Sequence, residues 1–72
     1  MKKKIQEIMS EIFEIDLSKI NDLTSQKNTP EWDSLSHLNL IVEIEESFDI
    51  SFTPEQIGSM TSLEKILIEL KN

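Results

Sequence analysis

Apolar residues recur at three- and four-residue steps in three separate stretches of this chain, and this spacing is the strongest constraint on its fold. Gly58 is the only glycine, and Pro30 and Pro54 are the only prolines. No stretch rich in Val and Thr alternates apolar with polar residues, as a strand would. We therefore predict an all-α fold, a small four-helix bundle of three longer helices and one short helix, with a long loop between the first and second helices.

The chain has 72 residues and no cysteine, so its stability must come from the packing of apolar side chains. We expect one domain, residues 1–72. The longest apolar run is too short to cross a bilayer, and Met1 to Lys4 leads into a polar-interrupted helix rather than a hydrophobic signal core. These features predict a cytoplasmic monomer without stable membrane insertion.

The formal net charge is −7, and its distribution is uneven. Every charged residue between Lys27 and Lys65 is acidic. Such a surface repels phosphate backbones, so we expect neither nucleic acid nor an anionic membrane as a partner. Acidity can serve solubility alone, or it can serve a basic partner surface. The segregation of the acids favours the second interpretation.

Three apolar stripes define the longer helices. The first helix is predicted from about Lys2 to Glu14, the second from Asp33 or Ser34 to Ser47 or Phe48, and the fourth up to Lys71. The residues predicted to face the core are Ile5, Ile8, Met9, Ile12, Phe13, Leu40, Ile41, Ile44, Phe48, Leu63, Ile66, Leu67 and Leu70.

Capping signals bound the short third helix and the last helix. Thr53 and Gln56 form a capping box around a proline at the first helical position, and Gly58 is expected to end the third helix. Thr61 and Glu64 repeat the box and are predicted to cap the last helix.

The stretch from Ile15 to Asp33 has no helical period, and its Asp, Ser, Asn and Thr side chains favour turns. A free loop of this length is unusual in a small domain. We therefore predict an ordered crossing loop with a short turn near Leu17 to Asn21. The aliphatic residues expected to anchor it to the core are Ile15, Leu17, Ile20 and Leu23.

The second helix carries more apolar surface than a core contact needs, because a second apolar sector lies beside the core sector. This second sector contains Leu35, Leu38 and Val42. The carboxylates placed between or beside the sectors are those of Glu43, Glu45 and Glu46. The helix is then either buried on two sides or docks a partner through the extra sector. The small number of other helices favours docking.

Ser34 and His37 lie one helical turn apart, so serine–histidine catalysis is geometrically conceivable. The chain has no nucleophile elbow and no glycine-lined oxyanion site, so we do not expect an enzyme. His37 is expected to be a partly exposed polar residue beside the start of the helix. One histidine, no cysteine and scattered carboxylates also predict no metal site.

Ser34 stands where unpaired N–H groups and the helix dipole favour an anion. A phosphodiester on its oxygen would suit this position. Asp33 is a good N-cap residue, and a capping role for Ser34 beside it explains the serine almost as well. Local sequence therefore leaves two interpretations open, an attachment point or a helix cap.

Asp33, Ser34 and Leu35, followed by the apolar and acidic residues of the second helix, resemble the signature of acyl carrier proteins. Length, acidity and helix order extend the resemblance over nearly the whole chain. It implies a carrier rather than an enzyme, with 4′-phosphopantetheine transferred from coenzyme A to Ser34 and acyl groups held as thioesters. The residues implied to be recognised by the phosphopantetheinyl transferase are Asp33, Leu35, Leu38, Val42, Glu43, Glu45 and Glu46.

The resemblance also implies partner enzymes of fatty-acid, polyketide or related acyl and aminoacyl biosynthesis, with basic residues around an apolar depression. Ser36 and Asn39 replace acids that are usual in housekeeping fatty-acid carriers, and Trp32 is more typical of specialised type II carriers. The alternative is a non-carrier acidic helical interaction module in which Ser34 only caps a helix.

Overall fold

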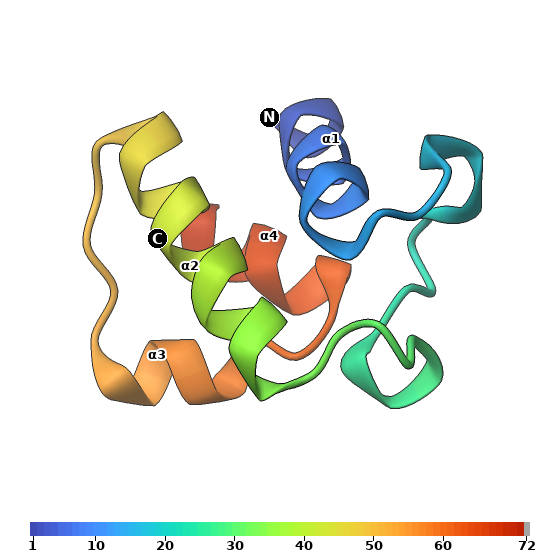
Figure 1. Ribbon diagram of the computed structural model, residues 1–72. Coiled ribbons are helices and arrows are strands. Elements are labelled where there is room, and N and C mark those ends of the chain that lie inside the picture. Colours follow the sequence, from blue (N-terminus) through green and yellow to red (C-terminus); the bar gives the residue numbers. More distant parts are fainter. Residues whose placement is uncertain (72) are drawn as a thin grey trace.

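The computed structural model describes residues 1–71, in which four α-helices enclose an apolar core (Figure 1). The helices are α1 (Lys2–Phe13), α2 (Ser34–Phe48), α3 (Pro54–Ser59) and α4 (Leu63–Lys71). The loop between α1 and α2 contains two 3₁₀ turns, Leu17–Lys19 and Gln26–Asn28. The predicted bundle of three longer helices and one short helix is confirmed, as is the turn near Leu17. None of the helices within residues 1–71 is long and apolar enough to cross a membrane.

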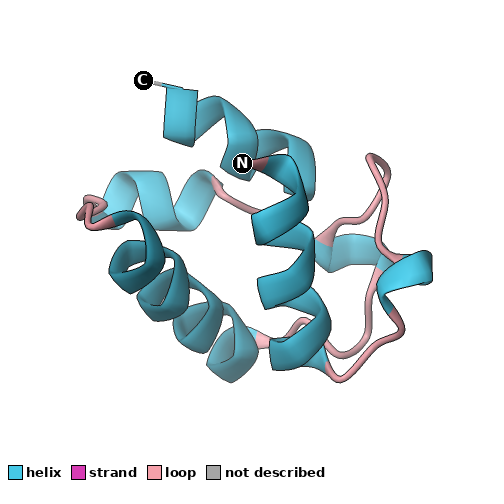
Figure 2. Ribbon diagram, turned by 90° about the horizontal axis from the view of Figure 1, so that it is seen from above, coloured by secondary structure: helices cyan, strands magenta, loops and turns pink. Residues whose placement is uncertain are grey.

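The core lies between α1, α2 and α4, with α1 contacting both of the other long helices (Figure 2). Most of the predicted core residues of α1 and α2 and half of those of α4 are buried, whereas Ile12, Phe48, Leu67 and Leu70 are only partly buried. The buried apolar residues are Ile5, Ile8, Met9, Phe13, Ile20, Trp32, Leu40, Ile41, Ile44, Met60, Leu63 and Ile66. Three of these come from outside the α-helices and complete the core.

The loop 14–33 is ordered, but two of its four predicted anchors are wrong. Ile20 is buried and Ile15 is partly buried, whereas Leu17 and Leu23 are exposed. A polar contact supplements the two apolar anchors, because Gln6 Nε2 on α1 donates a hydrogen bond to the Ile20 carbonyl at 3.0 Å. The loop therefore needs fewer aliphatic contacts than its sequence suggests.

The same loop pairs with the segment that leads into α4. The Gln26 N–H donates to the Thr61 carbonyl at 2.8 Å, and the Leu63 N–H donates to the Thr24 carbonyl at 3.0 Å. These bonds form an isolated antiparallel bridge between segments far apart in the sequence. Local sequence signals do not reveal such a pairing.

Two predicted helix boundaries are wrong. The last residue of α3 is Ser59, so Gly58 lies within the helix, and its φ is not positive. The cap of α4 is Ser62, whose Oγ accepts the Lys65 N–H at 3.1 Å, rather than Thr61. Pairing of the Thr61 carbonyl with the long loop sets this later start.

α3 is short and contains no fully buried side chain. Its predicted capping box is confirmed, with Thr53 N–H to Gln56 Oε1 at 2.9 Å and Gln56 N–H to Thr53 Oγ1 at 3.2 Å. Gln56 Nε2 also donates to Glu69 Oε1 on α4 at 2.8 Å. The connector 49–53 runs back along α2, so α3 lies near the first turns of α2 (Figure 1). These polar contacts supplement the partly buried Ile57, which packs α3 against the core.

Replacing a leucine on the core face of α2 should destabilise the protein far more than replacing one on its outer face. We expect Leu40→Ala to lower the free energy of unfolding by about 2–5 kcal/mol, because it opens a cavity in the core. The matched control Leu38→Ala should change it by less than about 0.5 kcal/mol, since that side chain is mostly in solvent. Urea denaturation measures both, and equal losses would contradict the assignment of the two faces.

Candidate functional site

Ser34 is the first residue of α2 and is exposed. The N-cap is its neighbour Asp33, whose Oδ1 accepts the Ser36 N–H at 2.8 Å. Capping therefore does not account for the serine, because an adjacent side chain already performs that role. The structure thus disfavours the interpretation of Ser34 as the helix cap.

The start of α2 suits a phosphodiester on the Ser34 oxygen. The N–H groups of Ser34 and Leu35 belong to the first turn, where no carbonyl of the same helix lies one turn earlier to accept them. The dipole of this 15-residue helix adds a partial positive charge at the same end. An exposed hydroxyl and N–H donors thus meet at one point, as attachment of a phosphate-linked group requires.

Asp33 carries the one resolved pKa shift among the described residues. The pKa of Asp33 is lowered from its ordinary value of 3.8, first because the Ser36 N–H donates to its carboxylate and then because the Ser36 hydroxyl does so. Both bonds favour the ionised form. The residue that caps α2 is therefore a carboxylate over the whole neutral range.

Trp32 anchors the turn that leads into Ser34. Its side chain is only 2 % exposed, and its ring centroid lies 5.1 Å from that of Phe13 on α1. Its backbone N–H donates to the Thr29 carbonyl at 2.9 Å. The chain therefore passes from the centre of the core to solvent between Trp32 and Ser34.

His37 connects this turn to α3. Trp32 Nε1 lies 2.9 Å from His37 Nδ1, and His37 Nε2 lies 2.8 Å from the Ile57 carbonyl oxygen. An indole nitrogen can only donate, so Nδ1 accepts and the ring hydrogen on Nε2 is donated to Ile57. The predicted partial burial of His37 is confirmed, but sequence reasoning missed both partners. The presence of Trp32 and His37 five positions apart was the one sequence signal for the first contact, although this spacing alone does not identify a hydrogen bond.

The second apolar sector of α2 faces solvent. The exposed fractions of Leu35, Leu38 and Val42 are 70 %, 56 % and 51 %. Because Ser34, Leu38 and Val42 follow one another at steps of four, this apolar strip extends along the helix from the serine. The possibility that α2 is buried on two sides is wrong, and the predicted outward strip is confirmed.

The three acids predicted beside the apolar strip have different environments. Glu43 and Glu46 are exposed. Glu45 is partly buried, and its Oε2 accepts the Phe52 N–H of the connector at 2.8 Å. Glu45 therefore has a structural role, and its use by partners stays a prediction.

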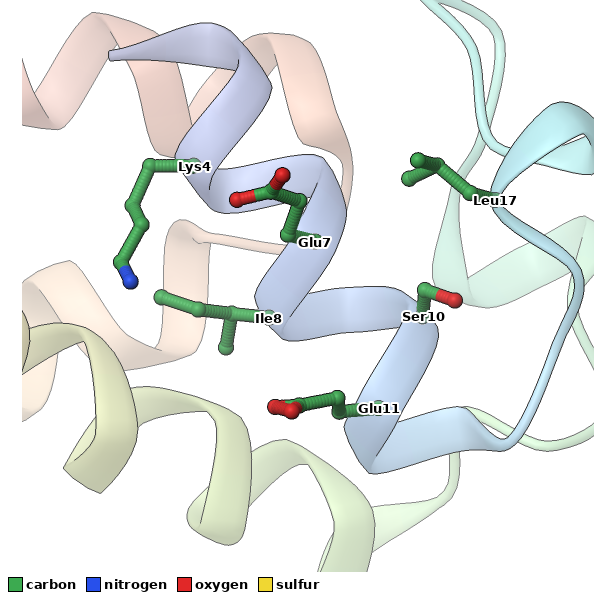
Figure 3. A pocket seen from close by; sticks show the side chains of 6 residues that line it. All are labelled: Lys4, Glu7, Ile8, Ser10, Glu11 and Leu17. Atoms are coloured by element: carbon green, nitrogen blue, oxygen red, sulfur yellow. The ribbon is translucent and has the colours of Figure 1, made fainter.

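A hollow on another side of α1 does not contribute to this site. It lies along α1, and Leu17 projects toward α1 from the first 3₁₀ turn (Figure 3). The residues that line it are Lys4, Glu7, Ile8, Ser10, Glu11 and Leu17. None of them belongs to the start of α2, so the Ser34 site is an exposed surface rather than this hollow.

Comparison with known proteins identifies the family. The chain is 33 % identical over 72 residues to the acyl carrier protein of Buchnera aphidicola subsp. Schizaphis graminum (strain Sg), a match that covers 100 % of this chain and 91 % of that protein. The chain belongs to the acyl carrier protein family. It is also 33 % identical over 63 residues to the acyl carrier protein of Rubrobacter xylanophilus (strain DSM 9941 / JCM 11954 / NBRC 16129 / PRD-1), covering 88 % of this chain and 78 % of that one. No protein-family model matches the chain.

Membership of the acyl carrier protein family supports a carrier role rather than catalysis. The family normally carries phosphopantetheine, and it implies interaction with a transferase and with acyl-processing enzymes. The exposed serine at the start of α2 is compatible with attachment of this group, and the outward apolar strip beside it is compatible with docking of partner enzymes.

The cap of α2 should make a pH-dependent contribution to stability. Because folding lowers the pKa of Asp33, its ionised form stabilises the folded state above pH 3.8, and this stabilisation is lost as the pH falls through the lower folded value. Asp33→Asn keeps a capping oxygen that does not titrate. Urea denaturation at pH 7 and pH 3 should show wild type losing more stability than the variant. The same difference between the two proteins at both pH values would contradict this role of the carboxylate.

Proposed function

We propose that residues 1–72 form an acyl carrier domain that holds acyl groups through 4′-phosphopantetheine attached to Ser34. The observation that carries this proposal is the exposed Ser34 at the first position of α2, with Asp33 as the cap, in a chain of the acyl carrier protein family. When attached, the group supplies a terminal thiol on which acyl groups are held as thioesters. The chain itself has no cysteine to compete with that thiol, which suits a reducing compartment such as the cytoplasm.

Attachment requires a nucleophilic oxygen that a transferase can reach. The Ser34 Oγ forms a new bond to the phosphorus next to pantetheine in coenzyme A, the diphosphate linkage breaks, and adenosine 3′,5′-bisphosphate leaves while the hydroxyl proton is released. The protein contributes the position of the oxygen, and the first N–H groups of α2 favour the resulting phosphodiester. Removal of the proton and stabilisation of the leaving group are left to the transferase.

The apolar strip and the exposed acids of α2 form the proposed docking surface for the transferase and for acyl-processing enzymes. Leu35, Leu38 and Val42 give an apolar centre, and Glu43 and Glu46 give negative charge beside it. Partners with basic residues around an apolar depression complement this surface. Such contacts associate quickly and weaken as salt screens the charges, as a carrier that visits several enzymes in fatty-acid, polyketide or related acyl and aminoacyl pathways requires.

The attachment site can be tested by mass spectrometry. Incubation with coenzyme A and a broad-specificity phosphopantetheinyl transferase should raise the mass of the wild-type protein by one phosphopantetheine group. Ser34→Ala should abolish the gain because it removes the nucleophilic oxygen. Ser47→Ala, which changes an exposed serine at the other end of α2, should leave the gain intact.

An unmodified wild-type protein, under conditions that modify a control carrier, would reject the carrier assignment. A gain of mass that persists in Ser34→Ala would instead place the attachment on another residue.

The docking surface can be tested by neutralising acids in pairs. We expect Glu43→Gln/Glu46→Gln to lower the transferase kcat/KM about three- to tenfold at low salt, the effect of two exposed charge pairs, and to flatten its salt dependence. The matched control Glu7→Gln/Glu64→Gln removes the same charge from exposed positions on α1 and α4. Equal losses for the two pairs would show that net charge, rather than this surface, guides the transferase.

A further inference from the structure

We infer that His37 is a positioning residue for the attachment reaction at Ser34, acting through a hydrogen-bonded bridge that joins Trp32 to α3. The inference rests on the proposed function, because it concerns how the carrier presents its serine to the transferase. Both ring nitrogens of His37 are engaged by Trp32 and Ile57, so the imidazole acts through these partners rather than on the reacting oxygen.

The bridge is one imidazole ring with a partner on each nitrogen. Nδ1 accepts from Trp32 Nε1 at 2.9 Å, and Nε2 donates to the Ile57 carbonyl at 2.8 Å. The indole and imidazole centroids lie 6.0 Å apart, with their planes inclined by 30°. The ring therefore meets a donor on one side and an acceptor on the other, and its single hydrogen matches both.

Each nitrogen of the imidazole pairs with a polar group that would otherwise lack a good hydrogen-bond partner and so destabilise the folded state. The Trp32 side chain is 2 % exposed, so its N–H needs a partner inside the protein. The Ile57 carbonyl belongs to the last turn of α3, where carbonyls lack full helical pairing, and the only backbone bond it accepts there is a long one of 3.3 Å from Met60. His37 thus fixes α3 and the indole together.

The connection to Ser34 follows from the positions of the two rings in the chain. Trp32 precedes Ser34 by two residues and His37 follows it by three, so their hydrogen bond joins the two sides of the turn that displays the serine. The Asp33 cap acts within the same turn. A turn closed in this way holds the backbone of Ser34 in one position relative to α2.

Without the bridge, the transferase would have to order the turn during binding. If only a fraction of the carrier molecules has the turn in the conformation that the transferase binds, the apparent dissociation constant for the carrier equals the intrinsic constant divided by that fraction. Loss of the bridge should therefore act on the KM for the carrier more than on kcat. A variant that is merely less stable, but still folded at the assay temperature, should show unchanged KM and kcat.

Three substitutions separate the two hydrogen bonds. His37→Ala removes both. His37→Asn places an oxygen near the position of Nδ1 and keeps an acceptor for Trp32, whereas His37→Gln extends a donor toward Ile57. The control Glu69→Ala removes the Gln56–Glu69 bond and so loosens α3 from α4 without touching the turn before Ser34.

The experiment measures transferase kcat and KM for each folded variant at saturating coenzyme A, together with the fluorescence of Trp32, the only tryptophan. We expect His37→Ala to raise KM about three- to tenfold, the range expected for the loss of the hydrogen bond to Trp32 that closes the turn, with kcat almost unchanged. His37→Asn should recover most of the wild-type KM and the wild-type emission spectrum, and His37→Gln should recover less. Glu69→Ala should leave KM unchanged.

An unchanged KM in His37→Ala would overturn the inference while leaving the carrier assignment in place. An equal rise of KM in Glu69→Ala would also overturn it, by reducing His37 to a general support of α3. If His37→Ala does not fold, the comparison of His37→Asn with His37→Gln decides, since equal KM values in that pair would contradict a bridge through Trp32. Failure of the wild-type protein to accept the group would reject the proposed function itself.

Discussion

The arrangement of the helices around the candidate site depends on the contacts of the buried Trp32 indole. The ring packs against Phe13 of α1, and its N–H reaches His37 on α2, whose other nitrogen reaches α3. One side chain from the end of the long loop thus ties three helices together. Because Trp32 is in the core and Ser34 is in solvent, the direction of the chain between them places the candidate attachment oxygen on the surface.

The exposed strip of α2 follows from how the core is completed. Ile20, Trp32 and Met60 reach the core from segments outside the α-helices, so α2 needs to contribute only one of its two apolar sectors. Leu35, Leu38 and Val42 are left in solvent, where contiguous aliphatic side chains are typical of interaction surfaces. Glu45 is the exception among the neighbouring acids, since its carboxylate holds the connector to α3. The surface proposed for partners is therefore narrower than the charge pattern of the sequence suggests.

Most of the candidate site could be predicted from the sequence, but the roles of its residues could not be separated. Asp33 and Ser34 are equally good capping residues, and the choice between them depends on where the helix begins by a single residue. His37 was expected beside the helix start, yet its two partners lie in Trp32 and in α3. The long loop was expected to be ordered, but Leu17 and Leu23 are exposed because polar contacts and the bridge to the segment before α4 hold the loop in place.

The four helices and most of their core faces could be predicted from the sequence, because helical periodicity and capping act between residues a few positions apart. Periodicity also revealed the second apolar sector of α2, but its exposure to solvent was one of two alternatives until the fold was known. Four further features were established by the folded structure. Asp33 caps α2, Trp32 is buried beside His37, Ser62 caps α4, and Glu45 holds the connector. These outcomes depend on where a neighbouring segment brings its donors and acceptors. That position is set by the packing of the whole chain, which local spacing does not encode.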